Sequence, residues 1–271
     1  MRFDDSAIAA VYRAIFERRD MRHFTPAPVD PATLARLLRA AHHAPSVGFM
    51  QPWRFIRITD AALRTEIHAL VEAERRATAD ALGERQDEFM RLKVEGVREC
   101  GELLVVALTD DRERHVFGRR TLPEMDLASA ACAIQNMWLA ARAEGLGMGW
   151  VSLFDVDALR TLLGMPAGAK PIAVLCIGHV DAFYAKPMLE EERWAARMPI
   201  DACLFENGWD APATQATQAT QAMQAMQAMQ ATQAADHAAS GGTSPGSSPS
   251  PGVSAADDLS DSTPAAAPPG R

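Results

Sequence analysis

Apolar residues near the start of the chain recur at helical spacing. In the stretch after Ser6 they form one stripe: Ile8, Val11, Tyr12 and Ile15. Serine is a common N-cap residue, and such a stripe is typical of an amphipathic helix. We therefore expect a helix that begins after Ser6 and ends in the polar cluster at residues 18–22.

A second helix is predicted to start at Asp30 and Pro31, because aspartate favours the cap and proline the first helical position. It carries apolar residues at helical spacing: Leu34, Leu37, Leu38 and Ala41. A stretch with two prolines and a glycine ends it, and residues 53–58 form a short predicted strand.

Later segments predict the core. Residues 102–109 are an apolar run of strand length, and residues 125–144 are apolar on nearly every side, which indicates a buried helix. Two further strands, at 148–154 and 171–180, are separated by a short helix at 156–163.

Two polar stretches are also compatible with helix. Residues 60–76 predict a charged helix, whereas residues 77–99 fit either a surface helix or a mobile cover over a site, with Arg91 and Lys93. Helices and strands thus alternate irregularly and without repeats. The pattern predicts one α+β domain, residues 1–210.

Composition changes abruptly after this domain. Residues 211–271 begin with a three-residue repeat of glutamine and alanine and continue into a stretch rich in serine, proline and glycine. A three-residue period drifts around a helix of 3.6 residues per turn, so no lasting apolar stripe forms. We expect a disordered tail without a catalytic role.

Charge excludes some classes of function. The chain has 27 basic and 35 acidic residues, of which one base and four acids lie in the tail, leaving 26 and 31 and a net charge of −5 for the body. This mildly acidic body gives no reason to expect nucleic-acid binding. Without a signal-peptide pattern or a long apolar stretch, a cytoplasmic protein with no membrane partner is expected.

Cysteines and histidines give no metal-binding pattern. The cysteines lie far apart and are expected to be small buried hydrophobes: Cys100, Cys132, Cys176 and Cys203. His42 and His43 are adjacent, so on a helix they point in different directions. The other histidines of the body are isolated in sequence: His23, His68, His115 and His179. No metal site is therefore predicted.

The segment RRDMRHF, residues 18–24, carries the first candidate chemistry. Arg18, Arg19 and Arg22 follow a helix end, with Arg18 and Arg22 one turn apart. Guanidinium groups suit a phosphate, and three together repel one another unless an anion is present. The alternative is a solvated cluster paired with Glu17 and Asp20.

Two loop segments could contact a flat ligand. Residues 41–55 (AHHAPSVGFMQPWRF) place proline, glycine, serine and glutamine between a helix and a strand, either to expose backbone groups or as an ordinary connector. Residues 145–152 (GLGMGWVS) lack the GxGxxG spacing, but their glycines permit close approach and Ser152 adds a hydroxyl. They fit a helix C-cap equally well. Arg193 and Arg197, one helical turn apart, form a second possible anion clamp.

These segments, in this order, resemble the nitroreductase family: RxDxRxF, APSxxxxQPWxF, GLGxGW and RxP. The resemblance spans residues 15–209. It implies a central sheet surrounded by helices, bound flavin mononucleotide (FMN), and a homodimer with two flavin sites at its interface. It also implies a C-terminal arm exchanged between the subunits.

The resemblance implies roles for individual residues. Arginines near the start would hold the flavin phosphate and ribityl chain, with Arg197 approaching the phosphate; Pro45 and Ser46 would lie along the isoalloxazine ring and Gly149 near its N5 edge. The complete implied flavin-binding set is Arg18, Arg19, Asp20, Met21, Arg22, Pro45, Ser46, Gly149, Ser152 and Arg197.

Two departures from an ordinary nitroreductase matter. That family usually has serine at the position of Asp20 and asparagine at that of Phe49, and a carboxylate beside an arginine clamp opposes phosphate binding. Residues 18–24, 40–58, 118–129 and 147–155 together resemble the branch that makes 5,6-dimethylbenzimidazole, the lower ligand of cobalamin. In that branch Asp20 and Ser152 would be catalytic.

The branch implies that reduced FMN is consumed with dioxygen, giving 5,6-dimethylbenzimidazole and erythrose 4-phosphate. A separate flavin reductase would supply the electrons from NAD(P)H. Asp20, held ionised by its arginine neighbours, would act as general acid or base, and Ser152 would hydrogen-bond the flavin edge and orient the oxygen adduct. The alternatives are an NAD(P)H-dependent nitro- or flavin reductase that recycles its flavin, a non-catalytic flavin-binding protein, and an interaction module formed by the tail.

Overall fold

A computed structural model describes residues 1–209 of the chain. Two compact units are distinguished, Met1–Arg197 and Met198–Arg271. The described part of the second unit holds one 3₁₀ turn, η4 (Ile200–Ala202), and a stacked pair of rings, Phe205 and Trp209. The predicted tail, residues 211–271, lies outside the described residues, so its disorder and the boundary at residue 210 stay predictions.

Four antiparallel strands form the sheet of the first unit, in the order β1-β2-β4-β3. They are β1 (Trp53–Arg57), β2 (Glu102–Leu108), β3 (Gly147–Val151) and β4 (Lys170–Gly178). Every residue of the central strand β2 is buried. β3 ends three residues earlier than predicted, so Ser152 lies just beyond the strand.

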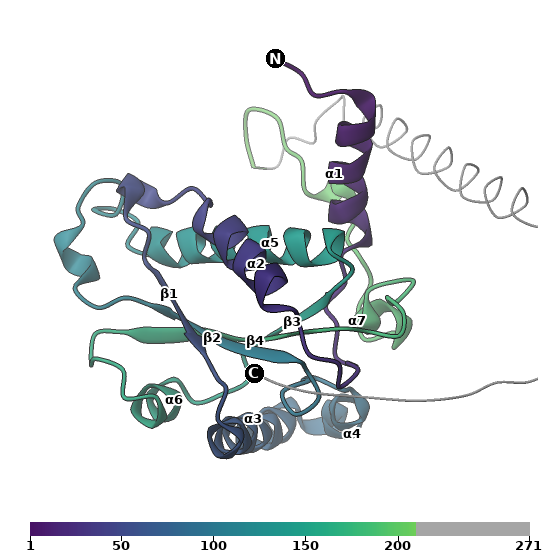
Figure 1. Ribbon diagram of the computed structural model, residues 1–271, viewed down its shortest axis with the longest axis vertical. Helices are drawn as coiled ribbons and strands as arrows, with labels where there is room; N and C mark the ends of the chain where they lie inside the picture. Colours follow the sequence, from purple (N-terminus) through teal and green to yellow (C-terminus); the bar gives the residue numbers. More distant parts are fainter. Residues whose placement is uncertain (210–271) are drawn as a thin grey trace, which may run out of the picture. The chain divides into compact units, whose positions relative to one another are not determined.

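Helices cover both faces of this sheet (Figure 1). One face packs against α2 (Pro31–His42) and α5 (Met125–Ala143), and the other against α3 (Ala61–Leu82) and α6 (Val156–Leu162). Side chains of a strand alternate between faces. In β2, accordingly, Leu104 and Val106 join the first core and Leu103 and Val105 the second. The predicted α+β fold with a central sheet among helices is confirmed.

Helix starts follow the capping rules. Asp30 caps α2 as predicted, since its carboxylate accepts a hydrogen bond from the Thr33 amide at 2.9 Å. The predicted cap of the first helix is wrong by two residues: α1 (Asp5–Glu17) is capped by Asp4, and Ser6 lies in the first turn with its hydroxyl donating to Asp4. The Asp4 carboxylate, two residues earlier, accepts from the Ala7 amide, so the helix starts before Ser6 can act as its cap.

The uncertain segment 77–99 is mostly helical. α3 extends to Leu82, and η2 (Gly83–Arg85) leads into α4 (Gln86–Arg91). Phe89 and Leu92 are buried in a small cluster with Ala79. The remaining short elements are η1 (Val47–Phe49), η3 (Arg112–Arg114) and α7 (Met188–Glu191).

The apolar stripe of α1 has no covering layer among the described residues. Val11, Tyr12 and Ile15 are exposed, and no residue of α1 is buried. The helix is amphipathic as predicted, but the described residues leave its apolar stripe exposed. No helix within residues 1–209 is long and apolar enough to cross a membrane.

Candidate active site

The arginine-rich segment leaves α1 and lies along the edge strand β3. Asp20 forms an isolated parallel bridge with Met148, and the Met21 amide donates to the Met148 carbonyl at 3.0 Å. α1 ends at Glu17, and Arg18 has an extended backbone. The expectation that Arg18 and Arg22 lie one helical turn apart is therefore wrong, because the chain extends to pair with the sheet.

Helix α5 holds this segment in place. The indole Nε1 of Trp138 donates to the Arg19 carbonyl at 3.1 Å, and its ring lies 4.6 Å from the Arg18 guanidinium carbon. One turn further along, Arg142 pairs with the Glu17 carboxylate. Glu17 is thus engaged by Arg142 and Arg13, and it does not neutralise the arginines at 18 and 19.

A cavity of about 340 Å³ opens above the end of β3. It is lined by Arg18, Arg19, Asp20, Arg22, Phe89, Leu92, Val94, Trp150, Val151, Ser152, Leu153, Pro187, Met188, Leu189, Trp194 and Arg197. Its volume lies in the usual range of ligand pockets. Six of the predicted site residues meet here, namely both proposed catalytic residues and four arginines.

The positive charges of the cavity arginines are only partly balanced by carboxylates. Burial lowers the pKa of Arg18, the neighbouring Asp20 raises it, and repulsion from Arg19 and Arg197 lowers it further. Mutual repulsion of this kind is relieved by a bound anion. The cavity wall around Arg18 and Arg197 can therefore hold a phosphate.

Arg19 and Arg22 use their donors differently. Arg19 donates to four backbone carbonyls, among them those of Tyr184 and Ala185. It therefore links the end of α1 to the segment around residues 184–185. The Nη2 of Arg22 donates to Asp20 and to the Trp150 carbonyl. Its Nε and Nη1 are buried and have no hydrogen-bond partner among the described residues. These two unsatisfied donors fit a site that is completed by a ligand.

Asp20 lines the cavity, and both of its carboxylate oxygens accept hydrogen bonds. Its Oδ2 accepts from Arg22 at 2.5 Å and its Oδ1 from the Trp150 amide at 3.1 Å. The side chain is 43 % exposed, but it is exposed toward the cavity while protein surrounds it on the other sides. Burial raises the pKa of Asp20, and the charges of Arg22 and Arg18 and the Trp150 amide lower it by less. The arginines therefore favour the ionised carboxylate, as expected, but burial has the larger effect and the net pKa is raised.

Gly149 lets the segment approach the strand. A Cβ built at this position would lie 2.3 Å from the Met21 carbonyl oxygen and 2.7 Å from the Arg22 Nη1. The family resemblance implies that Gly149 lies at the flavin edge, which stays a prediction; the structure shows a steric requirement of the protein itself. Nearby Gly145, with φ +76°, ends α5, so the reading of this segment as a helix C-cap is confirmed.

Apolar side chains form the opposite wall. Phe89, Leu92 and Trp194 pack near Leu153, and Arg85 stacks over the Trp194 ring at 3.5 Å. No motif in the sequence pointed to Phe89 or Leu92, because they come from the weakly patterned segment 77–99. Arg91 and Lys93, the two cations of this segment that were considered for a cover, are absent from the lining, and Lys93 pairs with Glu99 instead.

Three predicted features lie elsewhere. Arg193 has φ +58° and does not line the cavity, so the expected helical clamp with Arg197 is wrong; α7 has already ended at Glu191. Pro45 and Ser46 are also absent from the lining. Ser46 instead braces its own loop by accepting a hydrogen bond from the Gln51 amide at 3.0 Å.

Comparison with known proteins agrees with this geometry. The pattern of the nitroreductase family matches residues 15–179. The chain belongs to the nitroreductase family. It is 43 % identical over 189 residues to a 5,6-dimethylbenzimidazole synthase of Rhodospirillum rubrum, covering 69 % of this chain and 90 % of that protein. A 5,6-dimethylbenzimidazole synthase of Rhodobacter capsulatus is 37 % identical over 203 residues, covering 74 % and 98 %.

Solved structures support the fold. The NADPH:FMN oxidoreductase of Vibrio harveyi, in a complex with NAD⁺, matches with a TM-score of 0.56 and 22 % identity, over 80 % of this chain and 85 % of that one. At this identity the match establishes the shared architecture.

Replacing Gly149 by alanine should disrupt the site. The added methyl group would collide with the Met21 carbonyl, so the segment carrying Asp20 must move off β3. We expect a lower melting temperature and at least about a tenfold loss of FMN affinity, measured by fluorescence titration. Gly208→Ala, whose added Cβ would meet nothing within 4 Å, is the control and should bind like the parent. Unchanged binding by Gly149→Ala would show that the close approach is not needed.

Because the pKa of Asp20 is raised in the folded protein, ionisation of this side chain should lower the free energy of unfolding. Above the ordinary aspartate pKa of about 3.9, the unfolded chain releases a proton that the folded protein still retains. This contribution to stability is present at low pH and is lost as pH rises through the folded pKa. The melting temperature of Asp20→Asn minus that of the parent should therefore increase from about pH 4 to about pH 7.5. A decrease would mean that the arginines dominate.

Proposed function

We propose that the protein converts reduced FMN and dioxygen into 5,6-dimethylbenzimidazole and erythrose 4-phosphate. The observation that carries this is Asp20, a carboxylate with a raised pKa inside an arginine-lined cavity that Ser152 also lines. Two relatives that match most of this chain are 5,6-dimethylbenzimidazole synthases, which supports the same reaction here. The atoms balance if the pyrimidine ring of the flavin leaves as a third product. That product carries the oxygen atoms that the other two products do not contain.

The residues present fit the phosphate of FMN. Arg18 and Arg197 repel one another across the cavity wall, and Arg22 keeps two buried donors without partners among the described residues. We assign the phosphate and ribityl chain to these three arginines. Arg19, whose guanidinium is bound to carbonyls, shapes the pocket, and Met21, at 1 % exposure, supports it from below.

Asp20 and Ser152 would act on the substrate. A carboxyl whose pKa is raised accepts a proton more readily than an ordinary aspartate does. Asp20 can therefore move a proton on the ribityl side, while its contacts with Arg22 and the Trp150 amide fix its orientation. The Ser152 hydroxyl forms no hydrogen bond with another described residue and is free to orient the flavin edge.

A second copy of the chain would complete the site. The α1 stripe is exposed, and the loop at residues 45–51 carries three left-handed residues, Gly48, Phe49 and Gln51, of which Phe49 is 82 % exposed. Strained loop residues often belong to functional sites. We infer a homodimer in which Pro45 and Ser46 of one subunit reach the flavin of the other. We extend the same inference to an exchanged C-terminal arm.

The proposed reaction needs a source of electrons. Because the flavin is consumed, a separate reductase would reduce it with NAD(P)H. We place the reaction in the cytoplasm, without a nucleic-acid or membrane partner.

The helical segment at residues 77–99 supplies Phe89, Leu92 and Val94 to the cavity wall. We propose that it closes over the substrate and keeps water away from the reacting oxygen.

The reaction is tested with chemically reduced FMN and oxygen, followed by mass spectrometry of the products. The parent should yield 5,6-dimethylbenzimidazole, and Asp20→Asn should lower the yield at least about a hundredfold while binding FMN about as well. Asp157→Asn, which alters an exposed aspartate on α6, is the control. Intact flavin recovered from the parent would overturn the synthase function.

The same assay separates the alternatives. Rapid NAD(P)H oxidation by the pure protein, with flavin recovered after many turnovers, would indicate a recycling reductase. Neither product nor NAD(P)H oxidation, with flavin still bound, would indicate a binding protein.

The dimer is tested on the α1 stripe. Val11→Glu combined with Ile15→Glu places two charges on an apolar interface, so a dimeric parent should become monomeric in light scattering. Ala9→Glu, off the stripe on the same helix, is the control and should stay dimeric. A monomeric parent would contradict the proposed assembly.

A further inference from the structure

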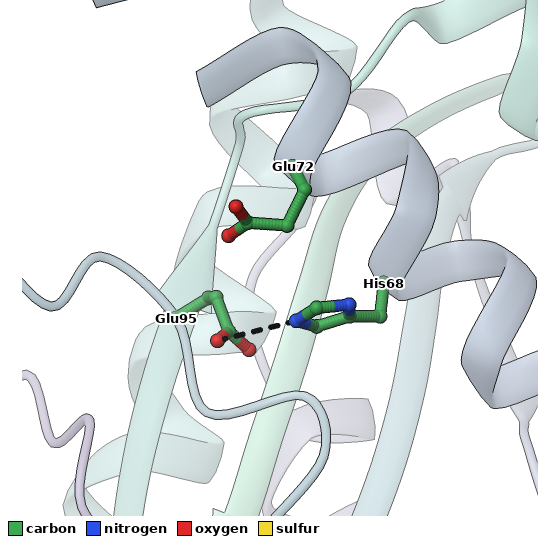
Figure 2. A group of neighbouring side chains, drawn as sticks. All are labelled: His68, Glu72 and Glu95. Carbon is green, nitrogen blue, oxygen red and sulfur yellow. Dashed lines mark ion pairs between the residues drawn. The ribbon is translucent and has the colours of Figure 1, made fainter. Parts of the chain in front are cut away.

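Three side chains that the proposed reaction does not use converge beside helix α3. His68 and Glu72 lie one turn apart on this helix, and Glu95 comes from the segment between α4 and β2. Figure 2 shows the imidazole and the two carboxylates turned toward one another. Their potential ligand atoms all lie within 4.8 Å of each other.

The spacing fits a shared cation better than a hydrogen bond. The Nε2 of His68 and the Oε1 of Glu95 are 3.6 Å apart, beyond the usual 2.7–3.2 Å of an N–H···O bond. Zinc–ligand bonds of about 2.0–2.2 Å at tetrahedral angles place two ligand atoms roughly 3.4 Å apart. A metal ion between the two atoms thus needs only a small adjustment.

In the described part of the chain, two of the three groups lack a hydrogen bond at the atoms that face the cluster, and the contact between them is the 3.6 Å ion pair of His68 with Glu95. Within residues 1–209, neither ring nitrogen of His68 has a hydrogen bond, and the Oε1 of Glu95 accepts none. Glu95 is only 8 % exposed, and its other oxygen accepts from the Val97 amide at 2.5 Å, which aims the free oxygen at the histidine. Two neighbouring carboxylates repel each other, and a shared cation relieves that repulsion.

The described charges around the cluster leave part of its negative charge uncompensated. Arg75 is the described cation that contacts the group, with its Nη1 3.4 Å from a Glu72 oxygen, while its Nη2 donates to the carbonyls of Met90 and Leu92. It offsets one of the two carboxylate charges. The remaining negative charge and the imidazole suit a cation that accepts both nitrogen and oxygen ligands.

We propose that His68, Glu72 and Glu95 bind one Zn²⁺ ion, with water in the fourth position. Imidazole with carboxylates is a zinc ligand set, whereas magnesium and calcium prefer oxygen alone. The earlier interpretation of His68 as isolated overlooked Glu72, four residues later on the same helical face.

The ion would act as a structural clamp. It joins α3 to the segment that contains Leu92 and Val94, both of which line the cavity, and Glu95 directly follows Val94. Next to it, a Cβ at Gly96 would lie 2.4 Å from the Phe24 ring and 3.0 Å from the Arg22 carbonyl, so this segment packs tightly on the arginine-rich segment. Zinc binding therefore fixes one wall of the cavity without entering the reaction.

The test is zinc binding by the full chain, freed of metal and flavin, in competition with a chromophoric zinc chelator. The parent should bind one ion per chain, and His68→Ala and Glu95→Gln should each weaken it at least about tenfold. Glu74→Gln, a half-buried glutamate on the same helix, is the matched control and should bind like the parent. No binding by the parent, or equal binding by all four proteins, would overturn the site.

Hydrogen exchange locates the ion independently of affinity. Zinc should slow amide exchange at residues 92–97 in the parent and in Glu74→Gln, but not in Glu72→Gln, whose conservative change preserves the fold. Zinc binding without this protection would place the ion elsewhere on the chain and overturn the proposal. Because no flavin is present, this result does not depend on whether the synthase function holds.

Discussion

The bare Cα of Gly149 is the constraint on which the candidate active site depends. Because glycine has no side chain, the segment carrying Asp20, Met21 and Arg22 can approach β3 closely enough for backbone pairing. That contact aims Asp20 at the Trp150 amide and brings the arginines to the end of the strand that leads to Ser152. Trp138 and Arg142 of α5 then fasten the segment from the other side.

Electrostatics gives this arrangement its chemical character. An ordinary arginine cluster would draw an aspartate toward its ionised form, but here burial has the larger effect and raises the pKa of Asp20. The same burial leaves two nitrogens of Arg22 without partners among the described residues. Under the proposed function, a bound phosphate would satisfy the arginines, whereas Asp20 would remain available for proton transfer.

Much of the fold could be predicted from the sequence, because amphipathic periodicity reports which faces are buried. The strands at β1, β2 and β4, the helix α5 and the cap at Asp30 were all predicted. The cap at Asp4 and the non-helical backbone at Arg193 were not, since each depends on competition between neighbouring groups.

The candidate site was only partly predictable. Arg18, Asp20, Arg22, Ser152 and Arg197 belong to recognisable motifs and do meet in one cavity. The apolar wall was missed because segment 77–99 has a weak pattern whose packing is decided by tertiary contacts. The convergence of His68 with Glu95 was equally invisible, since no spacing in the sequence relates α3 to a loop beyond α4.

The bridge between Asp20 and Met148 has one more consequence. β3 is at the edge of the sheet, and an unpaired edge offers backbone donors and acceptors to any passing extended chain. By occupying part of that edge, the segment that builds the substrate cavity also shields the sheet from intermolecular strand addition. The same few peptide groups thus both shape the candidate site and protect the edge of the sheet.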